Sequence, residues 1–306
     1  MQMKPLVTIA IPAYKATHLA ASLRSAVEQT YQETEIIVVN DQSPEDVEGV
    51  VKSFNDPRIR YHKNERNLGK NDPSRNWNEC LRRARGEWFC LLCDDDQYAP
   101  SFLETMMQLS VRYPACNVLR SGVSVIDGEG RETSRYPTSP EFETIEEYMW
   151  ALFHGQRRQT ISEFLLRRQT VWQAGGYVNL PYAWGSDNLS IFRFGLQGGI
   201  ASTSLLLTVF RDSGENISSD GRNMDEKLKA FRQYMQAAKD MVRDEGFRTD
   251  LYPVIDDYYR RACVDHIVEA DAEALCHIIS DRRRLEIPTR SILRALLKRW
   301  PRCLLH

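Results

Sequence analysis

The first hundred residues alternate between short apolar runs and longer segments in which apolar side chains recur every three or four positions. The short runs are rich in β-branched residues and have the length of buried strands, whereas the longer segments have the period of amphipathic helices. We predict strands at residues 6–11, 35–39, 58–62 and 89–93, and helices at residues 18–29, 44–54 and 75–85. Strands that alternate with helices predict an α/β fold, with a mostly parallel sheet flanked by helices and joined by right-handed crossovers.

The order of elements is less regular after residue 100. We predict further strands at residues 117–126, 161–166 and 200–210, and helices at residues 100–113, 141–153, 167–174 and 188–195. From about residue 223 the chain is charged and its apolar positions are helical in period. We therefore expect a main domain at residues 1–220, followed by a helical C-terminal extension at residues 221–306.

The last predicted helix, at residues 287–305, is basic and amphipathic. Its apolar positions fit a helix that packs on the main domain. A basic amphipathic helix also fits contact with anionic lipid at a membrane surface. The residues that carry this pattern are Arg290, Arg294, Lys298, Arg299 and Arg302, with Ile292, Leu293, Leu296, Leu297 and Trp300.

Composition narrows the classes of function. The 306 residues carry a net charge of −2, which provides no broad basic field for nucleic acid. Seven cysteines are scattered along the chain. Cys90 and Cys93 have C-x-x-C spacing but fall in or at the end of the predicted core strand, and there is no second Cys/His pair at zinc-ligand spacing, so we expect reduced thiols. We find no signal-peptide pattern and no apolar run long enough to span a bilayer. We therefore expect a cytoplasmic protein, with peripheral contact to the inner face of the membrane through the last helix as an alternative.

The predicted strand at residues 89–93 ends in three consecutive carboxylates, Asp94, Asp95 and Asp96. Ligands of open α/β sheets bind at the carboxyl ends of the strands. Three acids at such an end repel each other unless a cation neutralises them, and a divalent metal that carries a phosphate meets this need. An acidic turn in solvent, with Asp96 capping the next helix, is the alternative interpretation.

Two other predicted strands end in the segments Pro12-Ala13-Tyr14 and Asn40-Asp41-Gln42-Ser43. These segments should lie beside the acids, because the carboxyl ends of parallel strands meet at one edge of a sheet. A nucleotide across this edge would meet an aromatic ring, a carboxylate for a base N–H, and a metal site. The sequence contains neither a G-x-G-x-x-G motif nor a P-loop motif, which argues against a dinucleotide oxidoreductase and a P-loop NTPase.

Several stretches, in one order, resemble the family 2 glycosyltransferases, which have the GT-A fold with its Rossmann-like sheet. The resemblance covers about residues 6–220 and is best in the first hundred. The matching stretches are residues 7–14, 25–31, 35–43, 67–69, 76–78 and 84–88, followed by the acids and Pro100. The resemblance implies a nucleotide-diphosphate-sugar donor, a divalent metal and an inverting displacement. It also implies a nucleotide-binding half at residues 1–115 and an acceptor half at residues 116–220.

On the donor side, the resemblance assigns three residues to the base and ribose pocket, namely Pro12, Ala13 and Tyr14. Asp41 corresponds to the acid that contacts the edge of the base. Lys70 and Arg75 are weaker candidates for contacts to the base or the diphosphate.

The metal motif of the family is Asp-x-Asp, and in this chain Cys93 stands at its first aspartate. Asp95 falls on the metal-binding aspartate, so the resemblance assigns Mg²⁺ or Mn²⁺ to Asp95. Asp96 is a further metal candidate, and Asp94 or Asp96 would contact the ribose or support the metal ligand. Relatives often place a metal-binding His near residues 210–213, where this chain has none and Asp212 is the candidate substitute.

A later motif of the family is an acidic pair before a helix, whose aspartate is the general base. Here Ser186 replaces the first acid and Asp187 remains. Aromatic neighbours would raise the pKa of Asp187 towards the working range of a general base. The alternative is that Asp187 only caps the following helix. Tyr182 and Trp184, close to it in sequence, are candidates for stacking on an acceptor sugar.

These assignments predict an inverting glycosyltransferase that moves a sugar from a nucleotide-diphosphate-sugar, with a UDP-sugar favoured, to an acceptor hydroxyl in cell-surface polysaccharide or glycan synthesis. The acceptor would be a saccharide or a lipid-linked saccharide, and the basic pair Arg157-Arg158 favours an anionic or lipid-linked one. A sugar-nucleotide nucleotidyltransferase shares the sheet, but it would need a Gly-rich basic loop after the first strand. A non-catalytic carbohydrate-binding protein would not need both the acid cluster and Asp187.

Overall fold

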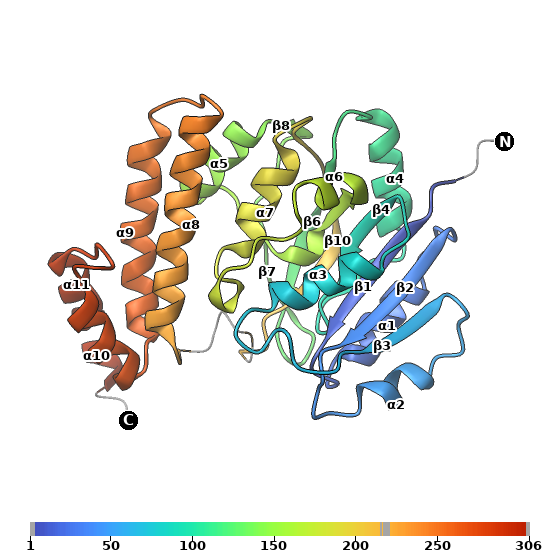
Figure 1. Cartoon of the computed structure of the whole chain (residues 1–306), viewed down its shortest axis with the longest axis horizontal. Helices are drawn as coiled ribbons and strands as arrows, with labels where there is room; N and C mark the ends of the chain where they lie inside the picture. Colours follow the sequence, from blue (N-terminus) through green and yellow to red (C-terminus); the bar gives the residue numbers. More distant parts are fainter. Residues whose placement is uncertain (1–3, 215, 217–220, 304–306) are drawn as a thin grey trace.

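The computed structural model describes residues 4–214, 216 and 221–303, with side chains as far as residue 298. A ten-stranded sheet forms the centre of the molecule. Helices cover both faces of the sheet, and further helices stand at one end, beside α5 (Ile145–Phe153) and α7 (Ser186–Gly195) (Figure 1). This is the α/β architecture that the alternation of strands and helices predicts.

The strand order is β3-β2-β1-β4-β9-β6-β10-β5, with β7 paired to β6 and β8 paired to β10. The strands are β1 (Val7–Ala13), β2 (Thr34–Asn40), β3 (Ile59–Lys63), β4 (Trp88–Leu91), β5 (Gln97–Tyr98), β6 (Val118–Ile126), β7 (Glu132–Arg135), β8 (Phe142–Glu143), β9 (Phe164–Arg167) and β10 (Ile200–Arg211). β3, β2, β1 and β4 run parallel to one another, as β6 and β10 do, and β9 lies antiparallel between β4 and β6. The carboxyl ends of β1, β2 and β4 therefore share one edge of the sheet.

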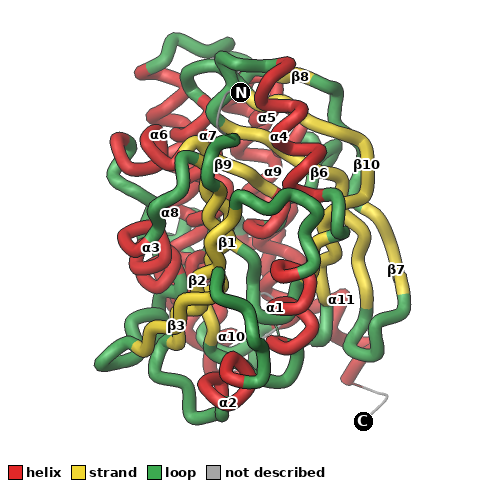
Figure 2. Tube along the Cα trace, turned by 90° about the vertical axis from the view of Figure 1, so that its right-hand side faces the viewer, coloured by secondary structure: helices red, strands yellow, loops and turns green. Residues whose placement is uncertain are grey.

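Side chains along β1 alternate between two apolar cores. Ile9 and Ile11 belong to the core under α1 (Leu19–Val27), whereas Ala10 belongs to the core under α3 (Ser74–Arg83). All three side chains are fully buried. Figure 2 shows α1 and α3 on opposite sides of β1, β2 and β3. Burial on both faces explains why this strand is a continuous apolar run rather than an alternating one.

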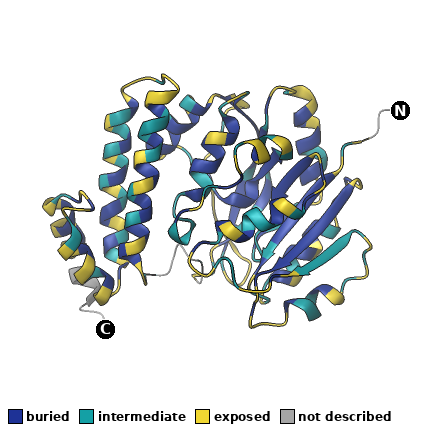
Figure 3. Ribbon diagram, in the orientation of Figure 1, coloured by how far each residue is buried: buried dark blue, intermediate teal, exposed yellow. Residues whose placement is uncertain are grey.

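The remaining helices are α2 (Val47–Lys52), α4 (Phe102–Arg112), α6 (Arg168–Gln173), α8 (Met224–Asp244), α9 (Leu251–Glu269), α10 (Ala272–Asp281) and α11 (Thr289–Cys303), with short 3₁₀ helices η1 (Ile161–Glu163) and η2 (Pro181–Ala183). The helices α8–α11 share one apolar core with α3, α5 and α7. Phe153 of α5 and Phe192 of α7 both lie within 6.2 Å, between ring centroids, of Tyr234 of α8. Figure 3 shows buried inner faces and exposed outer faces on these helices. Among the described residues, no helix has the length and apolarity needed to cross a membrane.

The predicted elements agree with the structure at their centres and differ at their ends. The predicted helix at residues 44–54 is shorter, because α2 starts only after Asp46, whose side chain accepts a hydrogen bond from the Gly49 N–H. The predicted strand at residues 161–166 begins as the 3₁₀ helix η1 and becomes extended at Phe164. Three short strands, β5, β7 and β8, were not predicted, because runs of two to four residues have no readable apolar period.

Candidate active site

The ends of β1 and β4 are joined through Asp94. Its Oδ2 atom accepts hydrogen bonds of 2.7 Å from the backbone N–H groups of Tyr14 and Lys15. The hydroxyl of Ser43, after β2, donates to the carbonyl oxygen of Tyr14 at 2.5 Å. The segments that follow β1, β2 and β4 therefore meet at one edge of the sheet. No residue that the structure describes donates a hydrogen bond to the second carboxylate oxygen of Asp94, which can accept from another donor.

The three candidates for a base and ribose pocket at the end of β1 differ in exposure. Tyr14 is 44% exposed, so its ring offers a free face at the sheet edge. Pro12 is partly buried. Ala13 is fully buried in the core under α1, so it supports the edge from behind.

Asp41 is buried at the end of β2 and holds the loop that follows β3. Its Oδ1 accepts hydrogen bonds from the Asn64 side chain at 2.7 Å and the Leu68 N–H at 2.8 Å. Its Oδ2 accepts one hydrogen bond, of 2.7 Å, from the Gly69 N–H. A side chain at Gly69 would place its Cβ 2.9 Å from this oxygen, so the close approach requires glycine. Oδ2 retains one lone pair for a further donor.

Lys70 and Arg75 lie at exposed positions in and after the same loop. The Arg75 side chain is 64% exposed and lies 3.5 Å from Asp72. Between them, the carbonyl oxygen of Asn71 accepts a hydrogen bond of 2.6 Å from the Tyr182 N–H. This bond joins the loop after β3 to the η2 segment that precedes Asp187.

The acid cluster follows β4. The Sγ of Cys93 and one carboxylate oxygen each of Asp95 and Asp96 lie within 4.8 Å of one another. Asp96 is fully buried; its Oδ2 accepts a hydrogen bond from the Ser162 hydroxyl at 2.6 Å and its Oδ1 one from the Arg211 N–H at 3.0 Å. The interpretation of Asp96 as a helix cap is not supported, since the N-cap of α4 is Ser101.

Burial makes this cluster unfavourable for negative charge. It raises the pKa of Asp94 to about 7, and the charge of Asp95 adds to the shift. Burial also raises the pKa of Asp95 and Asp96, while the positive charges of Lys15, His18 and Arg211 oppose the shift at Asp95. A cation placed between these oxygens would stabilise the ionised carboxylates.

The residues present fit a hard divalent metal such as Mg²⁺ or Mn²⁺. Carboxylate oxygens are the ligands that these ions prefer. Among the residues that the structure describes, the hydrogen bond from Asn216 to the Asp95 carboxylate is 3.5 Å long, longer than those to Asp94 and Asp96. Burial raises the pKa of the Cys93 thiol well above its usual range, and a soft sulfur atom is a poor ligand for a hard divalent ion. Asp212, the candidate substitute for a histidine, is exposed and outside the cluster.

Asp187 lies in the first turn of α7 and is partly buried. The N-cap of this helix is Gly185, so Asp187 is not a simple helix cap. Burial raises the pKa of Asp187 to about 6, and the neighbouring Asn188 backbone and Gln159 side chain oppose this shift by favouring the ionised form. Among the described residues, the Gln159 side-chain nitrogen is buried without a hydrogen-bond partner. A carboxylate with this pKa is ionised at neutral pH yet basic enough to accept a proton.

The loop before Asp187 has an unusual backbone. Tyr182 and Ala183 have φ angles of 58° and 53°, in the left-handed region that L-residues rarely adopt. Gly185 has a φ of 87°, and a Cβ there would lie 2.5 Å from the ring of Tyr234 in α8. Ser186, which replaces the family's first acid, is fully buried and accepts a hydrogen bond of 3.1 Å from the Leu180 N–H. The loop is thus held from α7 and from α8.

Trp184 and Tyr182, the candidates for acceptor stacking, pack against the C-terminal helices. The ammonium nitrogen of Lys227 in α8 lies 5.0 Å from the ring centroid of Trp184 and 5.8 Å from that of Tyr182. The ring of His266 in α9 lies edge-on to Trp184 at 5.0 Å. Helices α8 and α9 therefore shape the surface beside Asp187, a role that the sequence reading missed.

The segment at residues 158–163 connects the two acidic sites, and it too was missed. Ser162 donates to Asp96 and accepts a hydrogen bond of 3.1 Å from the Cys93 N–H. Three residues earlier, the carbonyl oxygen of the Gln159 side chain accepts a hydrogen bond of 2.7 Å from the hydroxyl of Tyr148, and the amide lies beside Asp187. The sequence feature that could have indicated this segment is the run of polar residues just before the strand predicted at residues 161–166.

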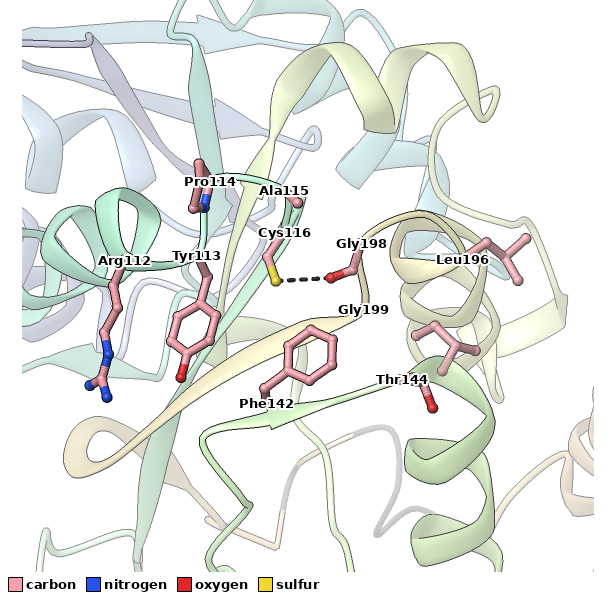
Figure 4. Close-up of a pocket in the computed structure, with 11 residues that line it drawn as sticks. Arg112, Tyr113, Pro114, Ala115, Cys116, Phe142, Thr144, Leu196, Gly198 and Gly199 are labelled. Atoms are coloured by element: carbon pink, nitrogen blue, oxygen red, sulfur yellow. Dashed lines mark hydrogen bonds between the residues drawn. The ribbon is translucent and has the colours of Figure 1, made fainter.

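A hollow of about 400 Å³ lies at the opposite edge of the sheet, where β6 and β10 begin. Figure 4 shows Tyr113 and Phe142 on its wall, and the Cys116 thiol 2.9 Å from the Gly198 carbonyl oxygen. None of the candidate site residues lines this hollow, so its size gives it no role in the chemistry of the carboxylates.

The sheet, the acid cluster after β4 and the carboxylate at the start of α7 define a GT-A type of fold. Staphylococcus aureus TarS 1-349 in complex with UDP-GlcNAc has a similar structure, with a TM-score of 0.64 and 16% identity over 89% of this chain and 83% of TarS. The mannosyltransferase PcManGT from Pyrobaculum calidifontis, in complex with GDP-Man and Mn²⁺, aligns with a TM-score of 0.58 and 13% identity over 98% of this chain and 88% of PcManGT.

The sequence matches glycosyl transferase family 2 over residues 8–171, and the chain belongs to this family. Mycobacterium tuberculosis protein MT1568 is 30% identical over 188 residues, or 57% of each chain. The GalNAc(5)-diNAcBac-PP-undecaprenol beta-1,3-glucosyltransferase of Campylobacter jejuni is 33% identical over 107 residues, or 34% of each chain. The chain spans 57%, 32% and 21% of the length of three curated relatives it matches.

Proposed function

We propose that the protein is an inverting glycosyltransferase that moves a sugar from a nucleotide-diphosphate-sugar, with a UDP-sugar favoured, to an acceptor hydroxyl. The observation that carries this proposal is the pair of acidic sites tied to one segment, with Ser162 bound to Asp96 and Gln159 beside Asp187. A single displacement needs one site for the leaving group and one base for the nucleophile. Membership of family 2 and the nucleotide-sugar complexes of structural neighbours support the same reading.

The donor nucleotide lies across the ends of β1, β2 and β4. The exposed ring of Tyr14 stacks on the base, and the free lone pair of Asp41 accepts a base N–H. Asp94 faces the ribose with its second oxygen. Lys70, in the exposed loop after β3, and Arg75, at the start of α3, approach the base or the diphosphate. Pro12 and Ala13 shape the floor of this pocket.

Asp95, with Asp96 behind it, would hold the divalent metal. When bound, the metal supplies charge stabilisation to the departing diphosphate. Ser162 and the Arg211 backbone fix Asp96, so Asp95 is kept at the edge of the sheet in a constant position.

Asp187 removes the proton from the acceptor hydroxyl as that hydroxyl attacks the anomeric carbon. An inverting displacement requires this base on the face of the sugar opposite the leaving diphosphate. The positive charge that develops on the sugar ring is oxocarbenium-like, as in other glycosyl transfers. Tyr182 and Trp184 provide the aromatic surface on which the acceptor sugar rests.

The acceptor in this proposal is a lipid-linked saccharide in cell-surface polysaccharide or glycan synthesis, presented at the cytoplasmic face of a membrane. The Campylobacter jejuni relative has a polyprenyl-diphosphate-linked saccharide in its name. In α11, Ile292 and Ala295 pack inward, whereas Leu293 and Leu297 are 56% and 73% exposed beside exposed basic residues. Anionic lipid fits such a face. Arg299, Trp300 and Arg302, which the sequence pattern included, lie outside the described side chains.

A vesicle experiment tests the membrane contact. The wild-type protein should co-sediment with vesicles that contain phosphatidylglycerol. The double variant Leu293→Glu/Leu297→Glu should remain in the supernatant. Equal sedimentation of the wild type with purely zwitterionic and anionic vesicles would refute an electrostatic contact.

A donor screen tests the proposed activity. Hydrolysis and transfer should be measured with UDP-, GDP- and dTDP-sugars, with and without EDTA, and we expect release of UDP that EDTA prevents. Release of pyrophosphate would instead identify a nucleotidyltransferase. If calorimetry in the presence of Mn²⁺ detects no binding of any nucleotide, the protein is not a glycosyltransferase, and a non-catalytic carbohydrate-binding protein is the remaining alternative.

A further inference from the structure

Arg157 and Arg158 are neighbours in sequence but have different environments. The Arg157 guanidinium lies 3.4 Å from Glu143, and both side chains are largely buried. Arg158 is exposed, and its guanidinium carbon lies 5.0 Å from the ring centroid of Tyr136. Among the described residues, Arg158 has no acidic partner. Arg157 is therefore structural, whereas Arg158 keeps its guanidinium available for an anion.

The backbone of Arg158 is fixed by a buried ion pair. The Arg120 guanidinium lies 3.0 Å from Glu163, and both side chains are almost fully buried. The same guanidinium donates to the carbonyl oxygen of Arg158 and, at 2.6 Å, to the hydroxyl of Ser139. The position from which the Arg158 side chain extends is thus determined by the interior of the protein.

Arg158 lies at the end of the connecting segment that is close to Asp187. Gln159, the next residue, is beside Asp187, whereas the contact to Asp96 is made by Ser162 at the far end. Burial, together with the negative charges of Glu163, Asp96 and Asp187, raises the pKa of Tyr136, and the charge of Arg158 opposes this shift. Arg158 is thus held over the Tyr136 ring on the same segment that contacts Asp96 through Ser162.

We propose that Arg158, supported by the ring of Tyr136, binds a phosphate group of the acceptor. The inference rests on the proposed glycosyl transfer and specifies the acceptor as one with a phosphate near the reacting sugar. A guanidinium presents paired N–H donors that match phosphate oxygens, and an aromatic ring below it limits its rotamers. The donor diphosphate has its own proposed site at Asp95, so Arg158, next in sequence to Gln159, serves the acceptor side.

The test compares acceptors that carry the same sugar but differ in the group at the anomeric carbon. N-acetylglucosamine and N-acetylgalactosamine would each be offered as the methyl glycoside, the 1-phosphate and the farnesyl diphosphate, with a UDP-sugar and Mn²⁺. For Arg158→Ala, we expect the KM of the phosphate-bearing acceptors to rise about tenfold or more, as for loss of a charge-assisted hydrogen bond. The KM values of the donor and of the neutral glycoside should change less than twofold. Arg158→Lys should recover part of the loss.

Arg193→Ala is the matched control, because Arg193 is exposed on α7 and carries the same charge. It should leave all of these KM values as in the wild type. Better use of the farnesyl diphosphate than of the 1-phosphate would identify a lipid-linked source of the phosphate, and equal use would identify a soluble phosphate ester. Both results support the phosphate site.

Three outcomes would overturn the inference. The wild type could prefer the neutral glycosides. Arg158→Ala could raise the KM of neutral and phosphate-bearing acceptors equally, or it could raise the KM of the donor instead. If the enzyme uses no acceptor in the set, binding of the sugar 1-phosphates can be measured by calorimetry in the presence of UDP and Mn²⁺. Equal affinity of the wild type and Arg158→Ala for these phosphates would refute the phosphate site. A wild type that binds no nucleotide-sugar would instead refute the proposed function.

Discussion

Ser162 donates its hydroxyl proton to the buried Oδ2 of Asp96 at 2.6 Å, although the two residues are 66 positions apart in the chain. The same hydroxyl oxygen accepts a hydrogen bond from the Cys93 N–H, so Cys93 and Asp96, at the two ends of the acid cluster, share Ser162 as a partner. Because Gln159 in the same segment lies beside Asp187, this serine sets the relative position of two acidic sites.

Ser162→Ala should weaken metal-dependent donor binding. Loss of the hydroxyl removes a hydrogen bond that favours the ionised form of Asp96, and it leaves buried polar atoms unpaired at a cost of about 1–3 kcal/mol. Titration of UDP binding with Mn²⁺ and thermal unfolding would measure the two effects. Ser110→Ala is a suitable control, since Ser110 is also buried but its hydroxyl donates to the Met107 carbonyl oxygen within α4. Mn²⁺ affinity equal in both variants would show that Ser162 does not support the acid cluster.

Asp95→Asn should abolish the dependence of donor binding on metal. An amide lacks the negative charge that a hard divalent ion requires. Asp212→Asn is the matched comparison, because the sequence makes Asp212 a candidate substitute ligand, whereas the structure places it outside the cluster. Calorimetry with UDP and Mn²⁺ should show loss of binding only for Asp95→Asn. A similar loss for Asp212→Asn would place Asp212 at the metal.

Gly185→Ala should destabilise the loop that carries Asp187. The new Cβ would collide with the Tyr234 ring, at a backbone φ of 87° that alanine rarely adopts. A cost of about 1–3 kcal/mol is expected for such strain. Gly128→Ala is the control, since no atom lies within 4 Å of its Cβ position, and its unfolding free energy should hardly change. Equal denaturation midpoints for the two variants would contradict the tight packing of α8 on this loop.

The pH dependence of transfer should follow Asp187. Its pKa is raised to about 6 by burial, so the fraction of ionised base falls as the pH drops below 6. The kcat should therefore be level above about pH 7 and decrease about tenfold per unit well below pH 6. Donor binding over the same range separates this effect from titration of the acid cluster. A kcat that rises on acidification would exclude Asp187 as a base.

The parts of the site that the sequence predicted are those carried by local patterns. Apolar runs that end in polar residues predicted that Tyr14, Asp41 and Asp95 lie at one edge of the sheet. This prediction does not depend on the details of packing, because the carboxyl ends of parallel strands lie at the same edge. The roles of Ser162 and Lys227 depend on contacts between segments far apart in the chain. Their side-chain chemistry is common at the surface, and only tertiary packing brings them to Asp96 and Trp184.

For the fold, too, local patterns were predictable from the sequence and contacts between distant segments were not. The helical period of residues 223 onward predicted helices, and α8–α11 confirm them. The sequence pattern did not indicate that Tyr234 of α8 would contact Gly185, because an apolar helix face does not reveal which surface it covers.

The most direct test of the account is the Asp187→Asn variant, assayed for sugar transfer and for UDP binding with Mn²⁺ in parallel. The account predicts a loss of transfer of about 10²–10⁴-fold, as expected for removal of a general base, with UDP affinity close to that of the wild type. Transfer that survives the substitution, or loss of transfer together with donor binding, would contradict the assignment of Asp187 as the base.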